Sequence, residues 1–329
     1  MKEIDEAIKS GKFNRVYLLS GEEVYLVKKY FDAIKKAVVD PATEMMNYNY
    51  FVGKADVDNI ISACDTLPFM SENRLVAVKD SKLFEAGRKD DSEKLKDYIQ
   101  NIPESTVLCF VEDKADKRSG LYKEIKKYGC CAEFSFLKDR ELIGWVCDEG
   151  KGRIKSDVAE YLIKCVGTAM ESLEGEIDKL LNYLPQDESV TRQTIDSICT
   201  KSPETNVFDM VEAIGKKQPA KALEIYNNML RMKQSPFYVL KMTARQFKLI
   251  LECKYLHGKG LSEAEISERL SLRNFVVRGC LSQAKNFKTG VLVEALKDCA
   301  KCDMDFKSGK ISDRLGVEVI ILKYSKSNV

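Results

Sequence analysis

The spacing of apolar residues divides the chain into two parts that differ in secondary structure. In the first part, short apolar runs alternate with segments whose apolar residues recur at helical spacing. The apolar runs predict strands at residues 15–19, 47–52, 75–78, 107–111 and 131–136. The helical spacing predicts helices at residues 22–39, 56–65, 92–100 and 121–128. Strands that alternate with helices indicate a mainly parallel sheet that is covered on both faces.

Beyond residue 138 the strand patterns end, and helical spacing continues. A group of short helices is predicted at residues 139–149, 156–166, 170–183 and 191–199. Ser156 and Asp157 are the predicted cap of the second, and residues 202–206 form either a linker or the start of a helix. Longer helices are predicted at residues 208–216, 219–232, 237–256, 263–270, 275–286, 291–307 and 313–323. The predicted fold is therefore α/β followed by all-α, with domains at residues 1–138, 139–205 and 206–329.

The turn after the first strand lacks the residues that bind nucleotide phosphates. A P-loop needs a second glycine followed by lysine and serine or threonine, because backbone amides hold the phosphates and lysine neutralises their charge. Here Gly21 is followed by Glu22 and Glu23, and no second glycine precedes Lys28. Carboxylates at the start of a helix are stabilised by its dipole and repel a phosphate. We therefore expect no nucleotide or other cofactor in this domain.

The strand predicted at residues 107–111 is followed by Glu112 and Asp113, which resembles the acidic end of a Walker B strand. Without a P-loop, this acidic pair has no triphosphate or magnesium to serve. The first domain therefore has the pattern of an NTPase fold that does not bind nucleotide.

Composition is that of an ordinary globular protein, but the charge is uneven. Of the 329 residues, 44% are hydrophobic and 32% are charged, and no apolar run approaches the roughly 18 residues of a membrane span. The first 13 residues lack the apolar segment of a signal peptide, so we expect a cytoplasmic protein without membrane contact. Residues 208–329 contain 22 Lys and Arg against 13 Asp and Glu, a net charge of +9, which leaves −7 for residues 1–207. The basic part suits a polyanion, although solvated helix faces explain it equally well.

Histidine and cysteine usage excludes several kinds of active site. The one histidine, His257, precedes a Gly-Lys-Gly segment, which favours a C-terminal helix cap over catalysis. The 11 cysteines are scattered through apolar stretches, and the single C-x-x-C pair, Cys299 and Cys302, lies in a helical pattern without a second pair. Paired catalytic carboxylates, a serine elbow and a dinucleotide motif are also missing. We therefore expect no catalytic residues, no metal site and free thiols in a reducing compartment.

The connection between residues 65 and 75 is apolar where a turn is usually polar. It contains Leu67, Phe69 and Met70 around Pro68, which restrains the backbone. Two interpretations remain open. These side chains either pack under the sheet as a satellite core, or protrude and enter a pocket on a partner. Full burial of each one in a partner contributes roughly 1.5–3 kcal/mol.

Several segments, taken in order, are similar to one known family. They are Val16-Tyr17-Leu18-Leu19-Ser20-Gly21-Glu22-Glu23, Leu67-Pro68-Phe69-Met70 with Asn73-Arg74-Leu75-Val76, Asp116-Lys117-Arg118, Leu173-Glu174-Gly175-Glu176-Ile177, Val207-Phe208-Asp209-Met210 and Ala244-Arg245-Gln246-Phe247. Their order and spacing, over essentially the whole chain, resemble the delta subunit of bacterial DNA polymerase III, a component of the sliding-clamp loader. The combination is specific, although no single segment is.

The resemblance implies an AAA+-like module without a P-loop, a small helical lid and a helical collar that joins a five-subunit ring. It implies a subunit of a DNA-directed DNA polymerase holoenzyme without a catalytic site of its own. The implied partners are the beta sliding clamp, clamp-loader subunits of the gamma/tau and delta prime types bound through the collar, and primed DNA. In this family delta opens or holds open one clamp interface. The resemblance assigns clamp binding to Leu67, Pro68, Phe69 and Met70.

A helix-turn-helix DNA-binding regulator is the competing hypothesis. Ser262 and Glu265 have the spacing of a capping box, and the helices predicted at residues 263–270 and 275–286 have helix-turn-helix spacing. The alternative is that these two helices pack in the collar through Ile266, Leu270, Val276 and Leu281. An enzyme with an unrecognised substrate is disfavoured, because no catalytic cluster is present.

A DNA contact is predicted beside these helices under either hypothesis. Phe275 lies between Arg273 and Arg278, so the ring is suited to stack on an exposed base while the arginines meet phosphates. The alternative is that Phe275 is buried in the collar.

Overall fold

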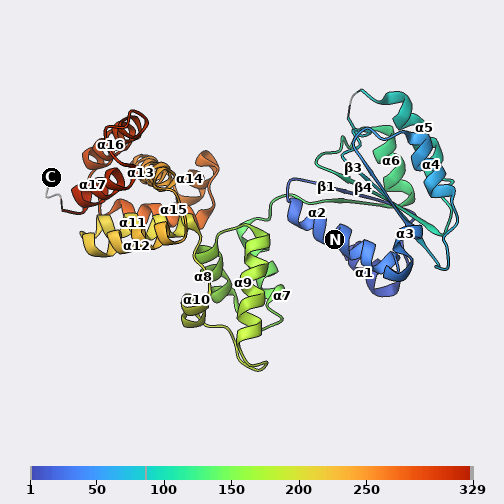
Figure 1. Ribbon diagram of the computed structural model, residues 1–329, viewed down its shortest axis with the longest axis horizontal. Helices are drawn as coiled ribbons and strands as arrows, with labels where there is room; N and C mark the ends of the chain where they lie inside the picture. The colour runs from blue at the N-terminus through green and yellow to red at the C-terminus, as the bar shows by residue number, and fades with distance from the viewer. Residues whose placement is uncertain (1, 86, 327–329) are drawn as a thin grey trace. The chain divides into compact units, whose positions relative to one another are not determined.

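The computed structural model describes residues 2–85 and 87–326. The chain forms two compact units, Met1–Phe136 and Leu137–Val329, which we describe separately. The first is an α/β unit, and the described residues of the second are helices and their connections (Figure 1). The predicted order of an α/β part followed by an all-α part is confirmed. The division of the helical part at residue 205 stays a prediction, because residues 137–329 form one compact unit.

The described residues of the first unit contain one parallel sheet with the strand order β2-β3-β4-β1-β5. Its strands are β1 (Val16–Ser20), β2 (Tyr48–Val52), β3 (Arg74–Lys79), β4 (Thr106–Glu112) and β5 (Cys130–Glu133). The three central strands are almost wholly buried, since helices cover both faces, and this is why the positions between their end residues are apolar. In contrast, β2 lies at an edge and exposes part of its side chains.

Helices cover both faces of the sheet (Figure 1). One face is covered by α4 (Val57–Asp65), α5 (Lys89–Ile99) and α6 (Gly120–Tyr128). The other face is covered by α2 (Val24–Val38), with α1 (Lys2–Ser10) packed beside it. On the first face, Leu18, Val76 and Phe110 of the strands form one core with Ile60 and Leu95 of the helices. This core fixes both ends of the connection from α4 to β3.

Two helical segments of the first unit have no counterpart in the sequence-based prediction. The helix α1 is mostly charged, yet Ile4 is fully buried because a narrow apolar stripe packs against α2. The segment before β2 forms a 3₁₀ turn, η1 (Pro41–Thr43), and a single α-helical turn, α3 (Glu44–Asn47). Both are too short to show a helical period. The strand β2 therefore begins one residue later than predicted, and Asn47 belongs to α3.

In the second unit, the first four helices lie between residues 139 and 198 (Figure 1). They are α7 (Asp139–Glu149), α8 (Ser156–Val166), α9 (Met170–Tyr183) and α10 (Arg192–Ile198). They are followed by α11 (Pro203–Gly215), α12 (Pro219–Arg231), α13 (Pro236–Gly258), α14 (Glu263–Leu270), α15 (Asn274–Ala284), α16 (Thr289–Lys307) and α17 (Asp313–Lys326). The long helix α13 packs against α11, α15, α16 and α17, and its Phe247 ring lies 5.8 Å from that of Phe287 and 6.2 Å from that of Tyr324.

The start of α11 decides between the two interpretations of residues 202–206. Ser202 Oγ accepts a hydrogen bond from the N–H of Thr205 at 3.1 Å, which is an N-cap, and Pro203 follows as the first helical residue. These residues therefore begin the helix and do not form a linker.

The predicted caps of two other helices have different outcomes. The cap predicted at Ser156 and Asp157 is wrong, because both lie inside α8, and Lys155 before them makes no side-chain capping bond. The capping box at α14 is confirmed. The N–H of Glu265 donates to Ser262 Oγ at 3.4 Å, and the Glu265 carboxylate accepts from the N–H of Ser262 at 2.8 Å.

Candidate functional site

The apolar connection between α4 and β3 is exposed to solvent. The exposed fractions of Leu67, Phe69 and Met70 are 78%, 55% and 83%, and Pro68 is half-buried. These side chains therefore do not form a satellite core. We call the four residues the apolar tip. Apolar side chains gathered on a surface are typical of a site that another molecule covers.

The backbone of the apolar tip is held by Asn47, the last residue of α3. The Asn47 side chain is fully buried. Its amide nitrogen donates to the carbonyl of Phe69 at 2.9 Å, and its amide oxygen accepts from the N–H of Phe69 at 2.7 Å. The same nitrogen donates to Thr43 Oγ1 at 3.0 Å. One buried side chain thus satisfies both backbone polar groups of a tip residue, as a paired β-strand residue does.

A second buried side chain, Arg74 at the start of β3, holds the other end of the tip. One guanidinium nitrogen donates to the carbonyls of Thr66 at 2.8 Å and Leu67 at 3.3 Å, and another donates to Oδ1 of Asn49. Arg74 is 3% exposed, and burial lowers the pKa of its guanidinium. Because water is excluded here, the carbonyl oxygens stabilise the buried charge.

Met70 closes the apolar tip with an unusual backbone conformation. Its φ is +49°, in the left-handed region that costs a residue with a side chain roughly 1–2 kcal/mol. The adjoining helix α3 exposes two further large apolar side chains, Met45 at 97% and Met46 at 62%. The sequence analysis missed Asn47 and Arg74 as parts of this site. No local pattern identifies Asn47, because its hydrogen bonds to the tip span 22 residues of chain.

In the turn between β1 and α2, two backbone N–H groups donate hydrogen bonds to carbonyls of the same unit. Gly21 donates to the carbonyl of Glu112 at 3.4 Å, and Glu23 donates to the carbonyl of Phe134 at 3.0 Å. The φ of Gly21 is +141°, and a Cβ there would lie 2.1 Å from the Phe134 carbonyl oxygen, so only glycine fits. These two donors are therefore committed to backbone carbonyls of the same chain rather than to a phosphate.

Glu112, which resembles the acidic end of a Walker B strand, has a structural role. It is 4% exposed, and its carboxylate accepts hydrogen bonds from the N–H of Ser81 at 2.9 Å and from the Ser81 hydroxyl. Burial raises the pKa of this carboxyl. Glu112 therefore joins the end of β4 to the loop after β3, whereas Asp113 is exposed.

The three predicted DNA-contact residues lie together around the start of α15. Arg273 donates to Asp139 of α7 at 3.1 Å, and Arg278 donates to Glu160 of α8 at 2.8 Å. Phe275 is half-buried. Both guanidinium groups are thus paired with carboxylates of the same unit, and the DNA contact stays a prediction.

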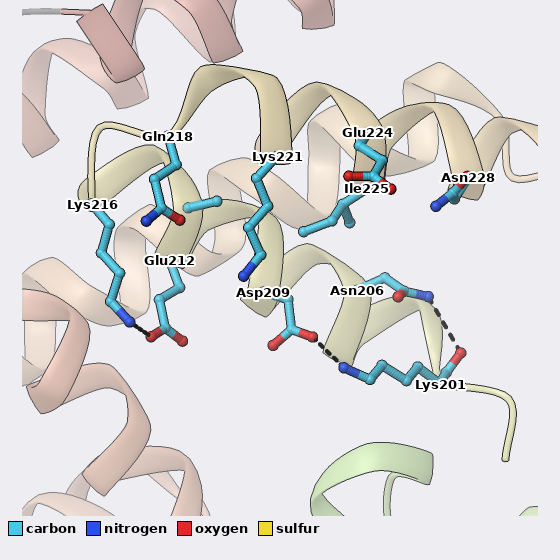
Figure 2. A pocket seen from close by; sticks show the side chains of 11 residues that line it. Lys201, Asn206, Asp209, Glu212, Lys216, Gln218, Lys221, Glu224, Ile225 and Asn228 are labelled. Atoms are coloured by element: carbon cyan, nitrogen blue, oxygen red, sulfur yellow. Dashed lines mark hydrogen bonds and ion pairs between the residues drawn. The ribbon is translucent and has the colours of Figure 1, made fainter. Parts of the chain in front are cut away.

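A groove of about 430 Å³ lies between α11 and α12 (Figure 2). Much of its charge is neutralised from within, because Lys201 pairs with Asp209 at 2.8 Å and Lys216 pairs with Glu212 at 2.5 Å. Lys221 points into the same groove (Figure 2). None of the predicted site residues lines this groove.

The helix-turn-helix segment packs as part of the helical core. Ile266 of α14 is fully buried, and Leu270, Val276 and Leu281 are partly buried against the same core. The packing alternative for these four residues is therefore confirmed.

The histidine and the C-x-x-C pair do not form a reactive site. His257 is exposed in the last turn of α13, with Nδ1 3.4 Å from the Leu261 carbonyl. Burial raises the pKa of Cys299 to about 12 and that of Cys302 to about 11, so both thiols stay protonated at neutral pH. Across residues 2–85 and 87–326, no three His, Cys, Asp or Glu side chains are grouped to hold a metal ion. No helix in the described chain combines the length and apolarity that crossing a membrane requires.

Comparisons with known proteins match the chain along its length. Residues 17–135 match the family model described as "DNA polymerase III, delta subunit", and residues 204–324 match "DNA polymerase III delta subunit, C-terminal domain". The DNA polymerase III subunit delta of Bacillus subtilis is 28% identical over 98% of this chain and 96% of its own length. A probable DNA polymerase III subunit delta of Aquifex aeolicus is 21% identical over 79% of this chain and 76% of its own. The solved structure of the Bacillus subtilis DNA clamp loader delta protein superposes with a TM-score of 0.74 at 28% identity, covering 99% of both chains.

The chain shares its α/β unit and its helical unit with the DNA clamp loader delta protein, and it lacks an intact P-loop, so it is a clamp-loader protein. The two family matches together span more than two thirds of the chain, one on each unit. The chain belongs to the delta subunit family of bacterial DNA polymerase III and is a clamp-loader subunit of the DNA replication machinery.

Proposed function

We propose that this delta subunit binds the beta sliding clamp through the apolar tip and opens, or holds open, one interface of the clamp for loading onto primed DNA. The exposure of Leu67, Phe69 and Met70 carries the proposal. These three large apolar side chains are exposed together on the connection of residues 66–73. Transfer of such a surface from water into an apolar pocket lowers the free energy of the complex.

The subunit acts by binding, and ATP hydrolysis belongs to its partner subunits. The turn that would hold a triphosphate supports this part of the proposal, because the N–H groups of Gly21 and Glu23 are bonded to backbone carbonyls. Glu112 supports it as well, since its carboxylate is buried against Ser81.

The helices from residue 206 onward form the collar that joins clamp-loader subunits of the gamma/tau and delta prime types in the cytoplasm. This part of the proposal is supported by large apolar side chains exposed on these helices and their connections. They are Met232, Phe237, Tyr255, Val293, Met304, Leu315 and Val319.

The double variant Leu67→Ala/Phe69→Ala tests the clamp-binding role. Each anchor contributes roughly 1.5–3 kcal/mol when it is buried, and about 1.4 kcal/mol corresponds to tenfold, so the Kd for the purified beta clamp should rise at least about a hundredfold. Surface plasmon resonance measures the Kd, and a thermal melt of the same sample measures stability. The melting temperature should stay close to that of the wild type, because both side chains are exposed.

Leu315→Ala/Val319→Ala is the control, because it removes two exposed apolar side chains from α17, in the other unit. This control should bind the isolated clamp as the wild type does. The proposal is wrong if the tip variant retains wild-type affinity, or if the control loses as much affinity as the tip variant.

A further inference from the structure

We infer that Asn47 and Arg74 are positioning residues that hold the apolar tip in its binding shape before the clamp arrives. The inference rests on the proposed function, because it concerns the same site. Neither side chain is exposed enough to touch the clamp, since Asn47 is 0% and Arg74 is 3% exposed. Both act on the clamp only through the loop that they hold.

The hydrogen bonds of these two residues are distributed over the backbone on both sides of Pro68. Arg74 binds the carbonyls of Thr66 and Leu67, and Asn47 binds the carbonyl and the N–H of Phe69. Pro68 itself has a restricted φ and no N–H. Successive residues from 66 to 69 are thus fixed either by a buried anchor or by their own ring.

An exposed connection does not need such anchors to satisfy its backbone, because water can bind its N–H and C=O groups. Burying an amide and a guanidinium is unfavourable unless their polar atoms are hydrogen-bonded. Of the six hydrogen bonds that the two side chains make, four go to the backbone of residues 66–69, whereas Nε of Arg74 is buried without a partner. The four bonds to the backbone define the shape of the loop. The left-handed Met70 agrees with this interpretation, since a strained residue persists only where its surroundings determine the conformation.

A preformed tip binds more tightly than a mobile one of the same sequence. A mobile loop must lose backbone and side-chain freedom at the moment of binding, and this loss subtracts from the affinity. Releasing either anchor should therefore raise the Kd for the clamp, although every apolar contact residue is still present.

Asn47→Ala and Arg74→Lys test the inference, with Arg88→Lys as the matched control. A lysine at position 74 cannot reach all three acceptors of the guanidinium. Arg88 is also nearly buried, with 11% of its side chain exposed, and it donates to the carbonyls of Ser81 at 2.9 Å and Ala55 at 2.7 Å. Unlike Arg74, it also pairs with a carboxylate, that of Asp91 at 2.7 Å. It is therefore a nearly buried arginine of the same unit that holds two backbone carbonyls without contacting the tip.

Three measurements are made on each full-length variant: the Kd for the purified beta clamp, the melting temperature and hydrogen–deuterium exchange. We expect Asn47→Ala and Arg74→Lys to raise the Kd on the order of tenfold. In both variants, hydrogen–deuterium exchange of the backbone amides should accelerate at residues 66–71 and stay unchanged in β4. We expect Arg88→Lys to lower the melting temperature about as much as Arg74→Lys does, and to leave the Kd for the clamp unchanged.

Wild-type clamp affinity in Asn47→Ala overturns the inference, whether or not exchange at the tip accelerates. An equal loss of affinity in Arg88→Lys also overturns it, because the effect is then general destabilisation. Should Arg74→Lys not fold, Asn47→Ala decides alone. Failure of the proposed function is a separate outcome, since it requires normal clamp binding by Leu67→Ala/Phe69→Ala.

Discussion

Asp298 of α16 is a carboxylate whose charge is stabilised by two side chains of α17. Partial burial alone would raise the pKa of this carboxyl, but hydrogen bonds from Lys323 Nζ and the Tyr324 hydroxyl outweigh the burial and lower it. A carboxyl with a lowered pKa in the folded state adds stability above its unfolded pKa, near 3.9. That stability is lost as the pH falls through the lower, folded pKa.

Asp298→Asn should therefore destabilise the protein at neutral pH and matter little in acid. We expect a loss of roughly 1–2 kcal/mol at pH 7, because hydrogen bonds to a charged group are removed beside the core residue Tyr324. Urea unfolding at pH 7 and at pH 3 measures the difference, which should shrink at the lower pH.

Asp303→Asn is the control, since Asp303 pairs with Lys307 one turn along the surface of the same helix. Asp303→Asn should lower the free energy of unfolding by no more than about 0.5 kcal/mol at either pH. A pH-independent loss in Asp298→Asn would show that packing, rather than charge, sets the contribution of Asp298.

Single residues show why only part of the candidate site is predictable from the sequence. Leu67 and Phe69 are found from the sequence because apolar residues are unusual in a turn. Asn47 and Arg74 give no such signal. Asn is an ordinary residue before a strand and Arg an ordinary first residue of one, and their roles depend on which backbone groups the fold brings to them.

At the scale of elements, the two arginines near the start of α15 are predicted to contact DNA but are paired with carboxylates in the structure. Asp139→Asn/Glu160→Gln would release Arg273 and Arg278 from their partners. We expect the assembled loader carrying this variant to bind primed DNA several-fold more tightly at low salt. Its affinity should also fall more steeply with salt, because more cations then meet phosphates.

Phe275→Ala completes this test, since stacking on a base contributes about 1–3 kcal/mol. If Phe275→Ala leaves both folding and the binding of primed DNA by the assembled loader unchanged, the stacking hypothesis is wrong. Unchanged DNA affinity after release of both arginines would assign them to joining α15 with α7 and α8.

Helices and strands can be predicted from the sequence where most of their side chains are buried, and are missed where only a few are. The central strands are recognisable because both faces are covered and their interior positions are apolar. The helix α1 is missed because a narrow apolar stripe suffices to pack it among many charges. The segment of η1 and α3 is missed because a single turn has no period to detect.

At the scale of the whole molecule, the subunit is expected to bind no ATP on its own. The physical reason is that the N–H groups of Gly21 and Glu23 are bonded to backbone carbonyls, and that Glu22 and Glu23 stand immediately before α2. Equilibrium dialysis with magnesium and ATP measures this, with a clamp-loader subunit that has an intact P-loop as the positive control. Stoichiometric, magnesium-dependent uptake at micromolar ATP by this chain would contradict the expectation.

The hydrogen bonds that Asn47 and Arg74 donate to or accept from the apolar tip all involve backbone N–H and C=O groups, which are the same in almost every residue. The shape of the loop is therefore largely independent of the side chains at positions 67 and 69. Under the proposed function, point substitutions at these positions would change the contact with the clamp while the loop keeps its form. Position 70 is more constrained, because its left-handed backbone disfavours β-branched residues. The backbone of the loop thus stays the same in shape while the side chains at positions 67 and 69 can differ between related subunits.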